Sequence, residues 1–275
     1  MRLRDSLADR LKAALLHLTI CGVVGLCAAA LIFIVWYPAP LSGAQGVGRM
    51  ALVLIGVDVA IGPLITLIVF DRGKKSLKFD LCVVAALQLA ALLYGLHAIH
   101  IARPALVVFN VDRFDVVPAV DVDPDSLAKS VAAGNAPLSW WHPRVVAARI
   151  PSDRKQRNAL LMSAIKGGPD LPQLPEFQVP YESEAPAVLA RARPLAELRE
   201  VNRLNKQQWK EFLHSLRRPE SELAYLPLRG KSRDGAVVID RASAKVIKIV
   251  LMEPSWGPIT HPDPAKSASQ QGHLG

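Results

Sequence analysis

Three long apolar stretches fill most of the first 102 residues, and short polar joints separate them. They run over about residues 13–37, 50–70 and 81–102. An α-helix rises about 1.5 Å per residue, so each stretch is long enough to cross a hydrocarbon core of about 30 Å. The pattern predicts a tail over residues 1–12 and three transmembrane helices within residues 13–102.

A cleavable signal peptide is the rival interpretation of the first stretch. Small residues of the kind found at cleavage sites occur at Ala28–Ala30. The apolar sequence continues through Leu31–Trp36, so cleavage would fall inside a run that is too long for a signal peptide. We therefore expect the first stretch to be a permanent membrane anchor.

Positive charge is unequally divided among the segments that flank the stretches. Residues 1–12 and the joint 71–80 each carry four Lys or Arg residues, whereas the joint 38–49 carries Arg49 alone. Positively charged short segments stay in the cytoplasm, so the N-terminus is predicted to be cytoplasmic. The part that follows residue 103 is then outside, which for a bacterial inner membrane is the periplasm.

Asp58 is the one charged residue inside a predicted span, and an ionised carboxylate there costs about 2.5–3.5 kcal/mol. Gly62 and Thr66 follow Asp58 at intervals of four residues, so the three form a stripe on one face of the helix. Pro63 cannot donate a backbone hydrogen bond, so we expect a helix kink next to Asp58. Tyr94 and Asp58 both lie eight residues from the outer ends of their spans, which predicts a hydrogen bond between them. Gln88 is placed too near the cytoplasmic side to be the partner.

Three roles for Asp58 stay open at this point. The first is an internal hydrogen bond that clamps the three helices, and the pattern favours it. The second is contact with a partner, aided by small residues that let helices approach closely. The third is a proton or ion pathway, which is disfavoured because a lone carboxylate lacks relay partners.

The remainder of the chain has the pattern of a soluble α+β domain, expected over residues 103–260. β-Branched and aromatic content predicts one strand over Ala105–Val117, and a hairpin is expected over Gly235–Leu251. Helices are predicted over residues 125–133, 153–166 and, interrupted by Pro194, 187–217. Residues 261–275 are polar and are expected to be disordered.

Adjacent tryptophans, Trp140 and Trp141, have two interpretations in this domain. They suit a membrane-surface anchor, because indole rings favour the interface. Burial in the core is the commoner fate of such aromatics, and the sequence favours that interpretation.

Composition and charge narrow the function classes. The mean hydropathy of +0.24 is high for a soluble protein, in agreement with membrane spans. The net charge of +9 is scattered along the chain and no nucleic-acid-binding motif is present, so we expect no nucleic-acid partner. Cys21, Cys27 and Cys82 all lie in the apolar stretches, which excludes a disulfide framework in the soluble part. The segment Arg229–Ser232 lacks the spacing of a phosphate loop, and we find no catalytic, cofactor or metal pattern. The sequence predicts a protein that works by contact and is not an enzyme.

Several segments together resemble the type IV pilin accessory protein family of inner-membrane proteins. The resembling segments are Val35–Pro38, Gly56–Phe70, Ser76–Leu81, Gln88–His97, Ala102–Phe114, Ala224–Ser232 and Asp240–Arg241. The resemblance implies a non-enzymatic role in type IV pilus assembly. The implied partners are a pilin subunit, other inner-membrane pilus machinery and membrane lipid.

Other classes remain as alternatives to the pilus role. One is a membrane-tethered periplasmic sensor or scaffold unrelated to pili. Another is a small transporter subunit, in which Asp58 would serve ion movement. A membrane-bound enzyme has the least support.

Overall fold

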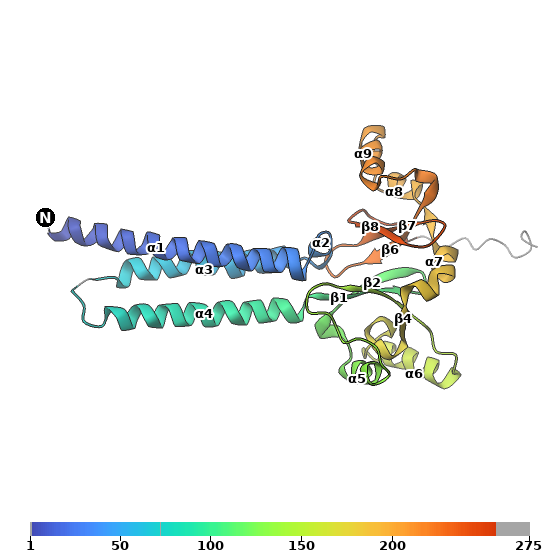
Figure 1. The fold of residues 1–275 in the computed structure, drawn as a ribbon, viewed down its shortest axis with the longest axis horizontal. Coiled ribbons are helices and arrows are strands. Elements are labelled where there is room, and N and C mark those ends of the chain that lie inside the picture. Colours follow the sequence, from blue (N-terminus) through green and yellow to red (C-terminus); the bar gives the residue numbers. More distant parts are fainter. Residues whose placement is uncertain (1, 72, 257–275) are drawn as a thin grey trace, which may run out of the picture.

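The computed structural model describes residues 2–71 and 73–256, and it places three long helices on one side of a sheet domain (Figure 1). Helix α1 (Arg2–Ala30) continues into the π-helix η1 (Leu31–Trp36), and α3 (Val47–Val69) and α4 (Leu77–Ile101) follow. Each is long and apolar enough to cross a membrane, which confirms the predicted helical spans. The expected disordered tail, residues 261–275, lies outside the described residues.

Small residues set how the three helices pack. Gly25 on α1 lies against Ile55 of α3, and Gly95 on α4 lies against Leu54 of α3. A Cβ at either glycine would press on these side chains, so both positions need the absence of a side chain for close approach. Gly56 meets nothing within 4 Å and faces away from the bundle. Helix α3 continues without interruption through the buried Pro63.

The sheet domain (residues 103–256) is built on one eight-stranded mixed sheet in the order β4-β3-β1-β2-β6-β7-β8, with β5 also paired to β6. β1 runs parallel to β3 and β2 parallel to β6, whereas the other pairs are antiparallel. The strands are β1 Pro104–Asn110, β2 Arg113–Pro118, β3 Arg144–Ala148, β4 Gln178–Pro180, β5 Arg193–Pro194, β6 Leu223–Arg229, β7 Gly235–Asp240 and β8 Val246–Val250. This mixed sheet with its helices confirms the α+β class.

The expectation of one strand over Ala105–Val117 is wrong. The chain turns back at Val111 and Asp112, so that β1 and β2 form an antiparallel hairpin. Val111 adopts a positive φ of 61°, which a β-branched residue rarely does and which sequence propensity argues against. Apolar residues continue on both sides of the turn, because both strands are buried, and the sequence pattern therefore hid the reversal.

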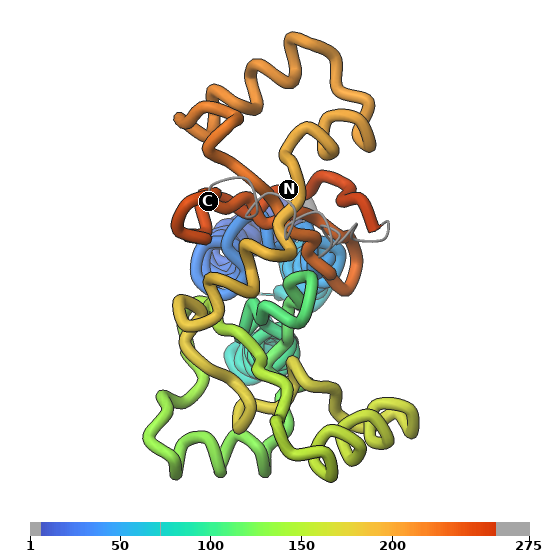
Figure 2. Tube along the Cα trace, turned by 90° about the vertical axis from the view of Figure 1, so that its right-hand side faces the viewer, coloured from blue at the N-terminus to red at the C-terminus, as the bar shows by residue number. Residues whose placement is uncertain are grey.

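Four helices of the domain lie in two groups, and α7 packs between them against the central strands (Figure 2). In the end-on view α5 and α6 lie on one side of the three long helices, and α8 and α9 lie on the other (Figure 2). The helices are α5 Pro124–Ala132, α6 Arg154–Ile165, α7 Ala185–Arg191, α8 Ala196–Val201 and α9 Lys206–Leu216, with 3-10 turns at Ala119–Asp121, Leu171–Gln173, Pro175–Phe177, Tyr181–Glu184 and Glu220–Glu222. The two shorter helix predictions are confirmed.

The third predicted helix, 187–217, is divided into three by β5 and by a turn before α9. Asn205 accepts a hydrogen bond from the Gln208 backbone N–H, and the Gln208 side chain accepts one from Asn205, so α9 begins with a capping box. Trp209 and Leu216 are buried against the sheet. The predicted hairpin over Gly235–Leu251 is confirmed as β7 and β8.

The joint between the first two spans is part of the sheet domain's core. It folds into the short helix α2 (Leu41–Gln45), and Leu41 is buried among Phe109, Val237 and other residues of the sheet. The membrane part and the sheet domain are therefore packed together through α2 as well as joined through the chain at residue 103.

Candidate functional site

A carboxylate and an amide meet between α3 and α4 in the membrane-spanning part. Gln88 Nε2 lies 3.2 Å from Asp58 Oδ1 and 3.2 Å from the Asp58 carbonyl oxygen, and it donates to both. The same nitrogen lies 3.7 Å from Cys21 Sγ on α1. Gln88 thus connects all three helices, and it satisfies the carboxylate that the sequence left without a confirmed partner.

The expected Asp58–Tyr94 hydrogen bond is wrong, and so is the exclusion of Gln88. Asp58 lies eleven residues before Val69, and Gln88 lies eleven residues after Leu77, so the two stand at the same height above the paired helix ends. The third helix begins at residue 77, four residues before the predicted start. Gln88 therefore lies farther from the start of its helix than the sequence suggested, at the depth of Asp58. Tyr94 is 77% exposed on the outer surface of the bundle.

The rest of the predicted stripe faces inward as expected. A Cβ at Gly62 would overlap Gln88 Nε2, so the glycine makes room for the amide. Thr66, which is buried, lies with its Oγ1 2.5 Å from His17 Nδ1 of α1. The stripe therefore contacts α4 through Gly62 and α1 through Thr66, and Pro63 is buried between them.

A groove of about 510 Å³ opens on this polar pair. Asp58 and Gln88 are its polar lining residues, and nine apolar side chains of α3 and α4 form its walls. Gln88 Oε1 is buried and accepts no hydrogen bond from the described residues. Within a bilayer such an acceptor is costly unless another group reaches it. The groove thus combines apolar walls with one polar pair, Asp58 and Gln88.

A second contact lies where the spans meet the sheet domain. The Ala44 carbonyl of α2 accepts backbone hydrogen bonds from Ser232 at 2.9 Å and from Arg233 at 3.1 Å. A Cβ at Gly230 would lie 2.7 Å from that carbonyl oxygen, so the close approach needs a glycine. We call this contact between α2 and residues 230–233 the outer clasp. Its residues lie partly in the segment that was rejected as a phosphate loop, and the structure gives them a structural role.

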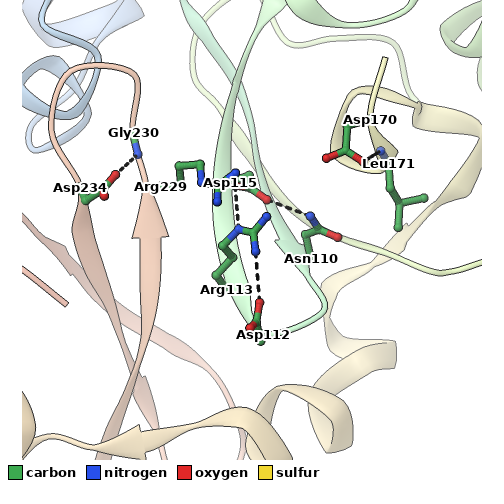
Figure 3. A network of polar contacts seen from close by, with 9 residues as sticks. All are labelled: Asn110, Asp112, Arg113, Asp115, Asp170, Leu171, Arg229, Gly230 and Asp234. Carbon is green, nitrogen blue, oxygen red and sulfur yellow. Dashed lines mark hydrogen bonds and ion pairs between the residues drawn. The ribbon is translucent and has the colours of Figure 1, made fainter. Parts of the chain in front are cut away.

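A polar network connects the β1–β2 turn to β6, the strand that leads into residues 230–233 of the outer clasp (Figure 3). Asp115 accepts hydrogen bonds from Asn110 Nδ2 at 3.0 Å and from Arg113 Nε at 3.2 Å. Arg229 on β6 lies 3.8 Å from the same carboxylate.

Beyond Arg229, Asp234 accepts a hydrogen bond from the Gly230 N–H at 3.1 Å. Asp112 lies in the turn between β1 and β2, where it pairs with Arg113. These contacts hold residues 230–233 in position. Within the described part of the chain, no group of three His, Cys, Asp or Glu side chains could hold a metal ion.

Sequence reasoning missed Gln88 and the outer clasp for different reasons. Gln88 carries a usable signal, since a polar residue within an apolar span needs a polar partner. The clasp uses backbone groups of Ala44, Ser232 and Arg233, which leave no side-chain pattern to read.

Comparison with known proteins places the chain among pilus proteins. Residues 5–46 match the family model described as Fimbrial assembly protein FimB. The fimbrial assembly protein of serogroup E1 of Dichelobacter nodosus is 30% identical over 84% of this chain and 90% of its own length. The serogroup I protein of the same organism is 31% identical over 82% of this chain and 88% of its own. No solved structure matches the chain. These matches agree with the resemblance seen in the sequence, and the chain belongs to the family of fimbrial assembly proteins.

Proposed function

We propose that this protein is a non-enzymatic accessory factor of type IV pilus assembly in the bacterial inner membrane. Its relatives carry the name fimbrial assembly protein, and its three apolar helices suit a membrane protein. The distribution of Lys and Arg among the short joints supports a cytoplasmic N-terminus and a periplasmic sheet domain. In this role it acts on pilin subunits while they are still held in the bilayer.

The groove between α3 and α4 is the proposed contact for the transmembrane helix of a pilin. The observation that carries this proposal is the Asp58–Gln88 pair in a groove of about 510 Å³ with apolar walls. A helix that covers the groove shields the Asp58–Gln88 pair from lipid and packs against the apolar walls. The sheet domain then meets the pilin's globular part outside the membrane.

The test is recovery of pilin with the tagged protein from membranes. Asp58→Ala removes the side-chain acceptor of the Gln88 amide, Asp58→Asn keeps a side-chain acceptor without the charge, and Gly62→Leu displaces Gln88. Gly56→Leu is the matched control, since Gly56 faces away from the bundle. We expect Asp58→Ala and Gly62→Leu to lose pilin and surface pili, whereas the control keeps both. Unchanged recovery and piliation in all three site variants, at normal protein levels, would reject the groove.

Deletion of the gene separates two forms of the proposed role. An empty cell surface with normal pilin levels indicates a factor that acts in fibre assembly. Loss of pilin itself indicates a factor that stabilises the subunit in the membrane. Normal pili and normal pilin would contradict both forms.

The proposed orientation has an independent test. Protease added to spheroplasts should cut the sheet domain while leaving the joint 71–80 protected until the membrane is opened. Protection of the sheet domain in intact spheroplasts would place it in the cytoplasm and exclude a periplasmic meeting with pilin.

A further inference from the structure

Three aromatic rings contact one another in a row, with their planes tilted by 52° and 37°, where the spans meet the sheet domain. Trp36, the last residue of η1, has its ring centroid 4.7 Å from that of His100, near the end of α4. On the other side, His100 lies 4.4 Å from the ring of Trp140, which belongs to the loop before β3. These ring contacts place Trp140 beside the two helix ends.

Arg103 fixes the loop that carries Trp140. Its guanidinium donates to the His100 carbonyl at 2.9 Å and to the Ser139 carbonyl at 2.9 Å. Ser139 Oγ in turn accepts hydrogen bonds from the backbone N–H groups of Trp141 at 3.2 Å and His142 at 3.3 Å. The position of both tryptophans relative to α4 is therefore set by hydrogen bonds on either side of them.

Both tryptophans are open to the surroundings, so the favoured expectation of core burial is wrong. Trp140 is 63% exposed and Trp141 is 62% exposed, whereas Trp209 of α9 is buried in the core. Two adjacent exposed indoles on a braced loop form an apolar patch that water solvates poorly. Indole rings with a polar N–H are favoured at the boundary between lipid and water.

We propose that Trp140 and Trp141 insert into the headgroup region of the leaflet that faces the sheet domain. The occupant of this surface is lipid, because the ring contacts place Trp140 at the ends of η1 and α4, and these are the ends of the candidate membrane spans that adjoin the sheet domain. The pair adds a further attachment beside the three spans and holds the sheet domain against the membrane surface. This inference is independent of the pilin contact proposed above.

The experiment uses the full-length protein in liposomes whose phosphatidylcholine is brominated high on the acyl chains. Tryptophan emission is compared between brominated and ordinary lipid for wild type, the double variant W140F/W141F and the control variant W256F. The difference between wild type and the double variant isolates the emission of the pair. We expect brominated lipid to remove most of that difference, and we expect W256F to leave the quenched amount unchanged.

Soluble iodide provides the opposing measurement. Indoles in the headgroup region are quenched by brominated lipid and protected from iodide, whereas indoles in water show the reverse. Strong iodide quenching of the pair with no effect of brominated lipid would overturn the inference. The single variants W140F and W141F, checked by circular dichroism, give the same comparison if the double variant does not fold.

Discussion

The protein holds distant segments together at two places, and the two use different chemistry. Between α3 and α4 the contact is made by side chains, with Gln88 Nε2 bonded to Asp58 and Gly62 leaving room for it. At the outer clasp the contact is made by the backbone, with Ala44 accepting two N–H groups. Leu41, three residues before Ala44, adds an apolar side chain to the sheet's core.

The difference follows from the surroundings of each place. In a bilayer, apolar burial does not favour helix contact, so small residues and polar pairs decide which helices meet. At the outer clasp Leu41 is buried in the core of the sheet domain, and this burial contributes the hydrophobic term that the membrane contact lacks. We therefore expect substitutions at the clasp to cost more stability than substitutions in the bundle.

The largest effect is expected from Leu41→Ala. Loss of a buried leucine costs about 2–5 kcal/mol in the free energy of unfolding, because both transfer energy and packing are lost. Ser42→Ala in the same short helix is the control, since its half-buried side chain lies outside the core. Denaturant unfolding of the detergent-solubilised protein, followed by fluorescence, measures both. Equal midpoints for the two variants would show that α2 adds nothing to the sheet domain.

A smaller effect is expected from Gly62→Ala. The new methyl group displaces the Gln88 amide from Asp58, and hydrogen bonds between membrane helices contribute about 0.5–2 kcal/mol. Gly56→Ala is the control, because it is the same substitution in the same helix and its methyl group meets no neighbour. Thermal unfolding in detergent should show a lower Tm for Gly62→Ala alone. A Tm shift of the same size in both would mean that helix propensity, not the polar pair, is being measured.

The smallest effect is expected from protonation of Asp240, which lies at the end of β7. Hydrogen bonds from the Ser243 hydroxyl and backbone N–H, a further one from Ala242 and the charge of Arg218 lower the pKa of Asp240 below its ordinary 3.8. Since folding lowers this pKa, the stabilisation is complete above pH 3.8 and is lost as pH falls through the folded pKa.

The measurement is the difference in Tm between wild type and Asp240→Asn across acidic pH. The difference should be largest near neutral pH and shrink under acid, while Gly56→Ala, which meets no neighbour, shows no such dependence. A constant difference at every pH would contradict the assignment. The result also sharpens the comparison, because it assigns one acid response to a named residue of the sheet domain.

Elements with a strong local signal were predictable from sequence. The spans follow from apolar length, and α9 follows from its capping pair Asn205 and Gln208 with apolar residues on one face. The β7–β8 hairpin follows from two apolar runs around a polar turn. In each case the signal and the structure lie within the same short segment.

Predictions failed where the local signal was ambiguous or the partner was distant. The turn at Val111 was hidden because both strands of the hairpin are buried and no alternation marks their ends. Gln88 was misplaced because a helix start differs by four residues between the hydropathy pattern and the structure. The exposure of Trp140 and Trp141 depends on where their loop is fixed by Arg103, which composition does not reveal.

The sequence by itself determined that three apolar helices precede an α+β domain, because length, hydropathy and residue periodicity are local properties of the chain. It also determined that the carboxylate of Asp58, which lies inside an apolar span, requires a polar partner. Only the tertiary structure decided that this partner is Gln88, that Ala44 is bound by residues 230–233, and that the two tryptophans face outward. These contacts join residues far apart in the chain, and they depend on helix ends and backbone positions that the order of residues does not fix.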